Sequence, residues 1–350
     1  MIDINHYFKK IKAIICIKCF NTLTLYENRP FGEMVSRNNG NVALPGQYRQ
    51  GAPEKDKMNT PCPNCKFEKN IYLYKYKNFT SDKLDVRCTS LQYQKPNLIK
   101  CEKCHLIFSE LINQKFESFY EEVEDKLYID QILFKKKYFQ NTLKKIKKYL
   151  SIDKEVLEIG SYYGIFGSLI KPHVKKYKGL ELSKHAVNYA RENYYLDCEN
   201  NTINEYLKHD IKLDIILMSH VIEHLDDPFK NINTIQEKMD KSSILIFSTY
   251  NMDSFIAKLL GKNYHWIMPM HKYYFSKKVL KNILFRYNLE IIETITDTHI
   301  ISLKYFFIKI KAIFPFLSFL LNPLIKINLL SNVNIKINLG DLDIYIVRKT

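Results

Sequence analysis

A regular alternation of short apolar segments with helical stretches, beginning after residue 150, constrains the fold most. The apolar segments are strand-like and cover Glu155 to Ile159, Tyr177 to Leu182, Leu213 to Met218 and Ser243 to Ser248. Strands that alternate with helices predict an α/β domain with a mostly parallel sheet. Asn288 to Ile295 and Asp341 to Val347 supply two late strands.

The pattern divides the chain into four parts. Residues 1–57 form an extension, predicted to be partly disordered because its polar run holds turn formers and little to bury. Residues 58–112 hold paired cysteines, and residues 113–150 form a helical linker with apolar residues at three- and four-residue steps. Residues 151–350 are the α/β domain, with an apolar helical insertion at 302–330.

Two Cys-x-x-Cys pairs are typical of a metal site. Cys62 and Cys65 form the first pair, and Cys101 and Cys104 the second. Four thiolates on two tight knuckles predict a tetrahedral zinc ion. Because four cysteine ligands leave no open coordination position, we expect the metal to be structural rather than catalytic. Free core cysteines are the alternative.

A glycine-containing turn follows the first strand of the α/β domain. Val156 to Gly167 runs from a buried strand through Gly160 and Gly164 into a helix, so that the backbone can approach a ligand closely. Twenty-one residues after Gly160, Glu181 ends the second strand, where its carboxylate is placed to accept both hydroxyls of an adenosine ribose. A nicotinamide dinucleotide is disfavoured because the spacing does not supply Gly-x-Gly-x-x-Gly.

A third segment, Leu213 to Pro228, completes a family resemblance. With the Glu-x-Gly turn, Glu181 and the His-x-x-Glu-His-Leu-x-Asp-Pro run, residues 151–350 resemble a class I S-adenosylmethionine-dependent methyltransferase. The closest likeness is to the small-molecule branch with ubiquinone O-methyltransferase-like and sugar-modifying members. The resemblance implies a Rossmann-like sheet of seven strands, the last antiparallel and inserted beside the sixth. Cys101 to Phe108 also resembles the zinc-ribbon preface of some methyltransferases of glycan and natural-product pathways.

The resemblance implies a set of donor-binding residues. Glu158 and Gly160 would line the methionine end, Glu181 would hold the ribose, Asn201 and Thr202 would border the adenine, and Ser219 and His220 would lie beside the sulfonium. Gly164 belongs to the same turn. Tyr162 stands where the family has its middle glycine, a position where a positive φ would strain it. We interpret this as a variant in which an aromatic ring packs near the cofactor.

Histidines and one carboxylate supply the candidate catalytic groups. His220, Glu223 and His224 share one face if their segment is helical, so that either histidine could be a general base oriented by Glu223. A structural role under the sheet is the alternative, and resemblance to the ubiquinone branch also permits a divalent ion. His271 and the only tryptophan, Trp266, lie in the loop after the fifth strand, where acceptors commonly enter.

The net charge of the chain and the hydropathy of its insertion limit the nucleic-acid and membrane partners that we expect. The formal charge of +16 is interpreted first as a solvated surface, and the chain shows no base-reading motif, which disfavours nucleic acid. The insertion at 302–330 is too short and too interrupted by proline to span a bilayer. It predicts a lid or homodimer contact, with a patch for anionic membranes as the alternative and buried core as a third reading.

These patterns predict a cytoplasmic methyltransferase that modifies a small or lipid-linked acceptor, with a location at the membrane periphery as the alternative. A sugar hydroxyl in glycan biosynthesis is the favoured acceptor. The alternatives are RNA or tRNA methylation, and a non-catalytic zinc-ribbon binding protein with a degenerate methyltransferase domain.

Overall fold

The computed structural model describes residues 57–58, 60–76, 85–87, 89, 94–209, 211–313, 317–331 and 333–350. Apart from Lys57, the predicted extension 1–57 lies outside the described residues. The described chain forms two compact units, one of residues 58–301 and 338–350 and the other of residues 302–337. The predicted insertion 302–330 therefore belongs to a unit separate from the sheet.

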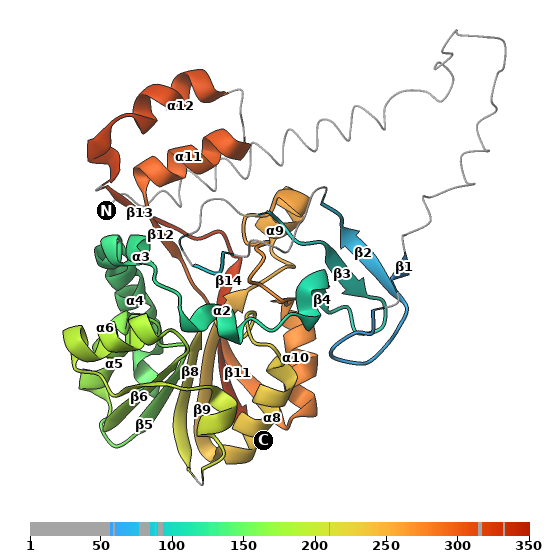
Figure 1. The fold of residues 1–350 in the computed structure, drawn as a ribbon, viewed down its shortest axis with the longest axis vertical. Helices are drawn as coiled ribbons and strands as arrows, with labels where there is room; N and C mark the ends of the chain where they lie inside the picture. The colour runs from blue at the N-terminus through green and yellow to red at the C-terminus, as the bar shows by residue number, and fades with distance from the viewer. Residues whose placement is uncertain are drawn as a thin grey trace, which may run out of the picture. The chain divides into compact units, whose positions relative to one another are not determined.

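The larger unit is built on a seven-stranded sheet with the order β11-β14-β9-β8-β5-β6-β7 (Figure 1). Its strands are β5 (Glu155–Ile159), β6 (Lys176–Glu181), β7 (Cys198–Asn200), β8 (Leu213–Ser219), β9 (Met239–Tyr250), β11 (Leu289–Thr296) and β14 (Leu342–Lys349). Strands β5 to β9 are parallel, whereas β14 is antiparallel to β9 and β11. The predicted Rossmann-like sheet with an inserted last strand is confirmed.

Helices cover both faces of this sheet, which explains why its central strands are almost continuously apolar. Val156 of β5 packs with α4 (Ile132–Ile146), α5 (Ile165–Ile170) and α6 (Lys184–Tyr194). Leu157 and Ile159 point the other way, toward α8 (Pro228–Lys238) and α10 (Lys277–Arg286). The remaining helices of this unit are η2 (Glu110–Asn113), α2 (Glu117–Glu121), α3 (Lys126–Asp130), η3 (Lys147–Tyr149), η4 (Lys171–His173), α7 (Ile203–Tyr206), α9 (Phe255–Leu260) and η5 (Gly261–Asn263).

A second sheet of the larger unit joins the cysteine segment to the α/β domain. Its order is β1-β2-β3-β4-β10, with bounds β1 (Lys57–Met58), β2 (Asn70–Tyr74), β3 (Leu98–Cys101), β4 (Ile107–Ser109) and β10 (Tyr273–Tyr274). Tyr273 pairs with Phe108 and Tyr274 with Ile107, both antiparallel. The cysteine segment is therefore continuous through hydrogen bonds with the loop that carries His271.

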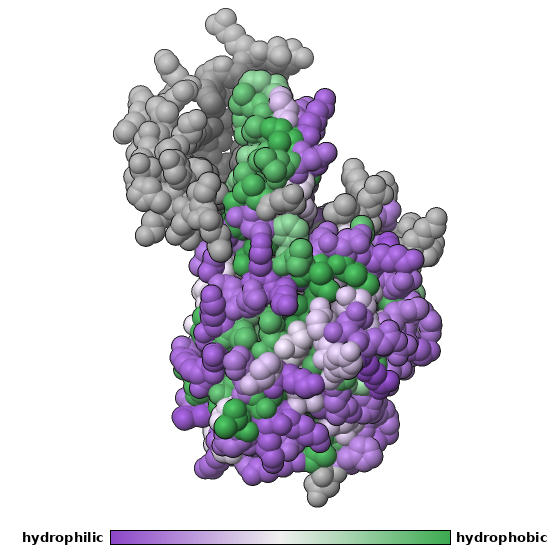
Figure 2. Space-filling view, turned by 90° about the vertical axis from the view of Figure 1, so that its left-hand side faces the viewer, coloured by the Kyte–Doolittle hydropathy of each residue, from purple (hydrophilic) through white to green (hydrophobic). Residues whose placement is uncertain are grey.

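The smaller unit is a helical hairpin. It contains α11 (Leu303–Ile313), α12 (Ser318–Ile325), η7 (Asn328–Ser331) and β13 (Asn334–Ile337), and β12 (His299–Ser302) leads into it. Figure 2 shows hydrophobic side chains gathered over these helices. None of the helices in the described ranges combines the length and hydropathy that crossing a bilayer demands.

Candidate active site

Three residues of the turn after β5 have a left-handed backbone conformation: Gly160, Tyr162 and Gly164. Gly160 has φ of +70° and Gly164, which caps α5, has φ of +76°. A side chain at Gly160 would place its Cβ only 2.5 Å from Val221 Cγ2, so this position needs glycine for space as well as for φ. Tyr162 adopts the left-handed conformation with φ of +46°. A non-glycine residue in this region stores roughly 1–3 kcal/mol, which its surroundings must offset.

Contacts around Tyr162 supply that compensation. Its backbone N–H donates a hydrogen bond of 2.9 Å to Glu181 Oε2. Its ring packs edge-on against Tyr128 at 4.7 Å and Tyr163 at 4.6 Å between centroids. The aromatic residue is therefore part of the turn's support, although no local pattern predicted its partners.

Glu181 links the tip of β6 to this turn. Its carboxylate is buried and accepts the N–H of Tyr162 at Oε2 and that of Ser183 at Oε1, the latter at 2.8 Å. Burial raises the pKa of Glu181, and the backbone N–H donors oppose that rise. A carboxylate has about four acceptor positions, so roughly two remain for the two hydroxyls of a ribose. The residues present therefore fit an adenosine-containing donor.

Glu158 lies beneath the turn. It is buried, and the hydroxyl of Tyr177 donates a hydrogen bond to its Oε2. Burial raises the pKa of Glu158 to about 8, against the lowering effect of Tyr177, and the charge of Glu181 adds to the rise. Gly167 makes room for this pair, because a Cβ there would lie 2.3 Å from the Tyr177 hydroxyl.

Asn201 and Thr202, predicted beside the adenine, follow β7 directly. The Thr202 hydroxyl caps α7 by accepting from the N–H of Glu205 at 3.1 Å. Asn201 accepts from the N–H of Thr202 at 2.8 Å and donates to Glu199 at 2.7 Å. Both side chains are half-buried and shape the edge of the sheet next to Glu181.

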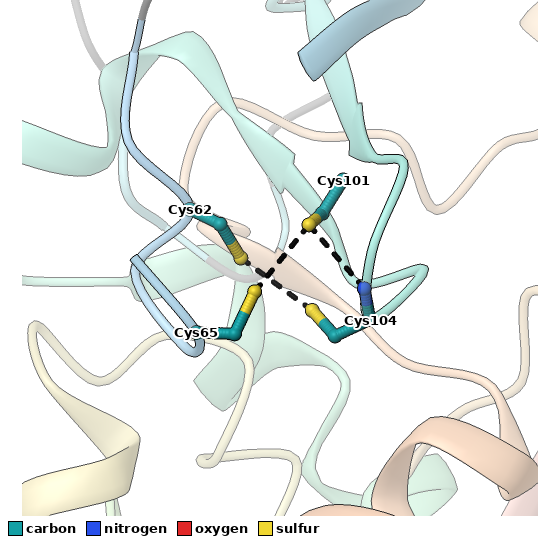
Figure 3. A group of neighbouring side chains, drawn as sticks. All are labelled: Cys62, Cys65, Cys101 and Cys104. Carbon is teal, nitrogen blue, oxygen red and sulfur yellow. Dashed lines mark hydrogen bonds between the residues drawn. The ribbon is translucent and has the colours of Figure 1, made fainter. Parts of the chain in front are cut away.

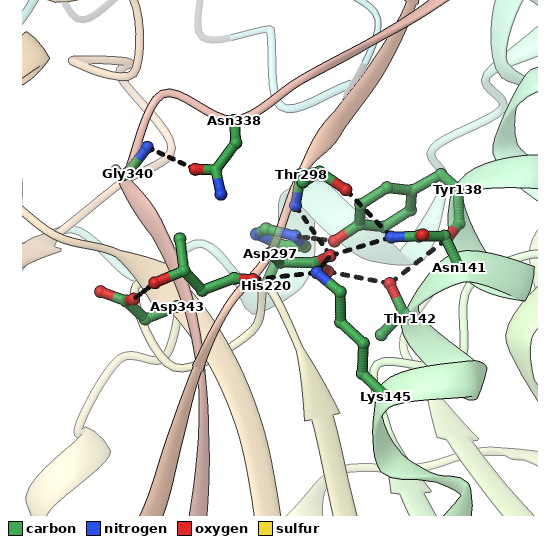
Figure 4. Close-up of polar contacts among 11 residues, drawn as sticks. Tyr138, Asn141, Thr142, Lys145, His220, Asp297, Thr298, Asn338, Gly340 and Asp343 are labelled. Atoms are coloured by element: carbon green, nitrogen blue, oxygen red, sulfur yellow. Dashed lines mark hydrogen bonds and ion pairs between the residues drawn. The ribbon is translucent and has the colours of Figure 1, made fainter. Parts of the chain in front are cut away.

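Ser219 and His220 lie where β8 ends, beside the β5 turn. Ser219 Oγ is 3.5 Å from Ser248 Oγ, and His220 adopts a left-handed φ of +55°. His220 Nε2 lies 2.9 Å from the hydroxyl of Tyr138 on α4 (Figure 4). The sequence analysis missed Tyr138, because nothing in a lysine-rich amphipathic helix marks one tyrosine as facing a distant strand end.

His220, Glu223 and His224 would share one face only if their segment were helical, and the segment from His220 to Asp227 is not helical. It forms turns, and α8 begins only at Pro228. The left-handed His220 is the physical reason, because it ends regular structure at the strand tip. His220 Nδ1 nevertheless lies 3.8 Å from Glu223 Oε1, so a turn brings the two side chains together.

His271 joins this group from a segment nearly fifty residues away. Its ring lies 4.7 Å from that of His224 between centroids. Glu223, His224 and His271 each place one ligand atom within 4.8 Å of the other two. Burial lowers the pKa of His224, and burial together with His224 lowers the pKa of His271 to about 3, so both imidazoles are neutral at pH 7.

An aromatic stack borders the histidines. Trp266 lies against Tyr250 with centroids 4.1 Å apart and planes tilted by 20°. Tyr250 in turn lies 5.0 Å from the His220 ring and 5.9 Å from the His271 ring. The Trp266 side chain was anticipated from sequence, whereas Tyr250 at the end of β9 was not.

The four cysteines of the two Cys-x-x-Cys pairs converge (Figure 3). The Sγ atoms of Cys62 and Cys104 are 3.5 Å apart and those of Cys65 and Cys101 3.6 Å apart, far beyond a disulfide bond of about 2.05 Å. Sulfurs bound at about 2.3 Å to one zinc ion lie roughly 3.8 Å apart, which is close to what is seen. The donor set therefore fits a zinc ion.

The two Cys-x-x-Cys knuckles share the same backbone conformation and hydrogen-bond pattern. Lys66 donates to the carbonyl of Cys62 at 2.9 Å, and His105 to that of Cys101 at 3.0 Å. Lys66 and His105 are both left-handed, with φ of 59° and 62°. This repeated turn directs each pair of thiols to one point.

Lys272 connects the knuckles with the histidine group. Its carbonyl accepts from the N–H of Ser109 at 2.8 Å, and its own N–H donates to the carbonyl of Glu223 at 2.9 Å. Its ammonium is buried and forms an ion pair with Asp226. The position of His271 therefore depends on the cysteine segment through the neighbouring residue.

Comparisons with known proteins show what the chain is similar to. Residues 133–294 match a family profile described as "Methyltransferase domain". A search of curated proteins finds no match. Among solved structures, the chain is similar to a SAM-dependent methyltransferase from Thermotoga maritima, at 18% identity and a TM-score of 0.43 over 67% of this chain and 98% of that one. It is also similar to one from Archaeoglobus fulgidus, at 20% identity and a TM-score of 0.44 over 65% and 100%.

Proposed function

We propose that residues 133–294, which match a profile described as "Methyltransferase domain", use S-adenosylmethionine, and that the chain methylates a hydroxyl of a small or lipid-linked acceptor, with a sugar as the favoured acceptor. The observation that carries the acceptor proposal is the Trp266–Tyr250 stack beside His220. An aromatic face of this kind suits the apolar face of a sugar ring or another planar group. A histidine next to it suits removal of a hydroxyl proton.

We assign donor binding to the edge where β5, β6, β7 and β8 end. The donor supplies a methyl group on a positively charged sulfur. Glu181 holds the ribose, and Asn201 and Thr202 border the adenine. Glu158, Gly160, Tyr162 and Gly164 form and support the turn near the methionine end, and Ser219 and His220, at the end of β8, lie beside the sulfonium.

His220 is the proposed general base. If its Nε2–H donates to the Tyr138 hydroxyl oxygen, its Nδ1 keeps a lone pair that can accept a proton from the acceptor. Glu223 Oε1, 3.8 Å from that Nδ1, stabilises the imidazolium that forms. Tyr138 is then a positioning residue that holds one tautomer.

Replacement of His220 by alanine is expected to lower kcat by roughly 10²- to 10⁴-fold, the usual contribution of a general base, while donor affinity changes little. Turnover is measured by transfer of a labelled methyl group, and donor affinity by calorimetry with S-adenosylhomocysteine. His209→Ala, at an exposed site, is the matched control. A His220→Ala enzyme with kcat within twofold of the native value would remove the general-base role.

The acceptor is tested by a labelled-methyl screen over nucleotide sugars, lipid-linked glycans and RNA. Transfer to a sugar hydroxyl supports the proposal, and transfer to RNA alone replaces it with the nucleic-acid alternative. Donor binding without transfer to any acceptor favours a non-catalytic binding protein.

We also propose that Cys62, Cys65, Cys101 and Cys104 hold a structural zinc ion, supported by their sulfur spacing and paired knuckles.

For the hairpin of α11 and α12 we propose contact with an anionic membrane surface. Phe319, Leu320 and Leu329 are largely exposed there. Residues 302–340 contain five lysines and no acidic residue, so the unit carries the charge that anionic lipid attracts. This charge complementarity is the reason to prefer lipid over a lid or a dimer contact.

Substitution of both Phe319 and Leu320 by serine is expected to weaken co-sedimentation with phosphatidylglycerol vesicles by about tenfold or more, because each large apolar side chain contributes about 1.5–3 kcal/mol on burial. Phe285→Ser, which changes an equally exposed phenylalanine on α10, should have no effect. Absence of native binding to anionic vesicles would eliminate the membrane proposal.

A further inference from the structure

One side of α4 carries polar residues that meet a buried carboxylate. They are spaced at i, i+3, i+4 and i+7, which places them on one side of a helix, and they are Tyr138, Asn141, Thr142 and Lys145. The carboxylate belongs to Asp297, which directly follows β11 and is 1% exposed. Figure 4 shows these side chains grouped around Asp297. This side of α4 is therefore fixed to the end of β11, separately from the apolar side that packs on the sheet.

The two carboxylate oxygens of Asp297 are not equally occupied. Oδ1 accepts hydrogen bonds from Lys145 Nζ at 2.7 Å, from the N–H of Thr298 at 2.8 Å and from Asn141 Nδ2 at 3.3 Å. Among the described residues, Oδ2 accepts one hydrogen bond, from the Thr142 hydroxyl at 2.9 Å. A carboxylate oxygen has about two acceptor positions, so one position of Oδ2 stays open.

The hydroxyl of Tyr138 lies between Asp297 and His220 (Figure 4). The hydroxyl oxygen is 2.9 Å from His220 Nε2. Burial raises the pKa of Tyr138 well above its ordinary value, and the negative charge of Asp297 raises it further, so the hydroxyl keeps its hydrogen at pH 7. Because a hydrogen bond to an ionised acceptor is roughly twice as strong as one to a neutral group, that hydrogen is drawn toward Asp297 rather than toward an uncharged imidazole.

We propose that Asp297 is a positioning residue that fixes the tautomer of His220 through Tyr138. The Tyr138 hydrogen is directed at Asp297 Oδ2, and the Tyr138 oxygen accepts the Nε2–H of His220. His220 Nδ1 then keeps its lone pair. This inference rests on the proposed function, in which that lone pair receives the hydroxyl proton of the acceptor.

The other charge near His220 favours the opposite tautomer. Glu223 Oε1 lies 3.8 Å from His220 Nδ1, and a carboxylate favours a proton on the nitrogen that faces it. A Tyr138 hydroxyl that donated to Nε2 would act in the same direction, and Nδ1 would then carry the proton and have no lone pair for the acceptor. The direction of the Tyr138 hydrogen therefore decides whether His220 can act as a base, and Asp297 sets that direction.

Nuclear magnetic resonance of the full-length protein, labelled with nitrogen-15 histidine, measures the tautomer directly. A protonated and an unprotonated ring nitrogen differ in chemical shift, and the His220 signals are those that disappear in His220→Ala. We expect Nε2 of His220 to be protonated and Nδ1 to be unprotonated. A native His220 with its proton on Nδ1 would overturn the proposal.

Asp297→Asn is expected to reverse the tautomer. The Oδ1 position faces the donors of Lys145 and Thr298, so the amide oxygen of the variant stays there and its NH2 group takes the Oδ2 position. An NH2 group donates to the Tyr138 oxygen, which turns the Tyr138 hydrogen toward His220 Nε2. The proton of His220 then moves to Nδ1.

The same variant is expected to lose roughly 10²- to 10⁴-fold in kcat, the usual contribution of a general base. KM and the affinity for S-adenosylhomocysteine should stay within about twofold, because neither binding site is altered. The kcat is measured with the acceptor found in the labelled-methyl screen. A His220 that keeps its Nε2–H in Asp297→Asn, folded as judged by circular dichroism, would also overturn the proposal.

Two comparisons separate this role from simple anchoring of the helix. Glu293 of β11 pairs with Lys148, just after α4, at 2.8 Å, and Glu293→Gln should leave the His220 tautomer unchanged. In a Tyr138→Phe background, adding Asp297→Asn should change kcat by less than about twofold, because residues that act through one another are not additive. A further loss of about tenfold or more in that background would mean that Asp297 supports the fold alone, which would overturn the proposal.

The tautomer is measured without an acceptor, so this proposal and the proposed function fail separately. A His220→Ala protein with nearly native kcat overturns the general-base role, whatever the tautomer is. An unchanged tautomer in Asp297→Asn, with kcat still lost in His220→Ala, overturns the role of Asp297 alone.

Discussion

The Glu181→Ala protein is expected to bind S-adenosylhomocysteine at least about 100-fold more weakly than the native chain. Two hydrogen bonds from ribose hydroxyls to a carboxylate are worth about 1.5–3 kcal/mol each, and both are lost. The substitution also removes the acceptor for the N–H of Tyr162, so the left-handed turn loses part of its support. Calorimetry with S-adenosylhomocysteine measures the affinity, and circular dichroism checks the fold.

A second carboxylate separates this effect from a general loss of negative charge. Glu155 begins β5, at the opposite end of that strand from the turn, and forms an ion pair with Lys175 at 3.5 Å. Glu155→Ala should leave donor affinity within about twofold, because exposed pairs contribute little. Native affinity in a folded Glu181→Ala protein would contradict the whole assignment of the donor site.

Cys62→Ser is expected to release the zinc ion and to unfold the cysteine segment. Structural zinc contributes about 10–16 kcal/mol of binding free energy that is coupled to folding, and three thiolates hold it far less well than four. The native protein should contain one tightly held zinc by elemental analysis, and the variant should contain none. Limited proteolysis should then cut the variant between residues 60 and 109 while the native protein resists.

The same variant should lose methyl transfer but keep donor affinity. The segment reaches His271 through the pairing of Phe108 with Tyr273 and through the hydrogen bond from Ser109 to Lys272, whereas Glu181 has no part in that pairing. Cys198→Ser changes a buried cysteine outside the cluster and should retain zinc. A Cys62→Ser protein that keeps one zinc and resists proteolysis would show that the cysteines are not its ligands.

Local sequence patterns anticipated the parts of the fold that depend on backbone geometry. The periodicity of apolar residues predicted the strands and helices. The order of these elements, with the family resemblance, predicted the parallel sheet with its inserted last strand. The Cys-x-x-Cys spacing likewise anticipated the converging thiols. In these cases the relevant neighbours are a few residues apart, or the pattern repeats over a whole element.

Local patterns left open what the backbone of a single residue decides. His220, Glu223 and His224 would share one face only in a helix, and the segment after the left-handed His220 forms turns instead. The apolar stretch predicted as a helical insertion at 302–330 contains α11 and α12, and the described chain groups residues 302–337 as a compact unit of their own. The periodicity of apolar residues predicts which side chains are buried, but it does not identify the residues against which they pack.

Local patterns were enough to predict the α/β class, the turn that precedes Gly164, the carboxylate at the end of the second strand and the two cysteine knuckles. Three features emerged from the folded chain alone: Tyr138 meets His220, Tyr162 tolerates a positive φ, and His271 completes a cluster with Glu223 and His224. The physical reason is that these partners lie far apart along the chain, and strand order and sheet pairing bring them together. No local period or spacing encodes that encounter.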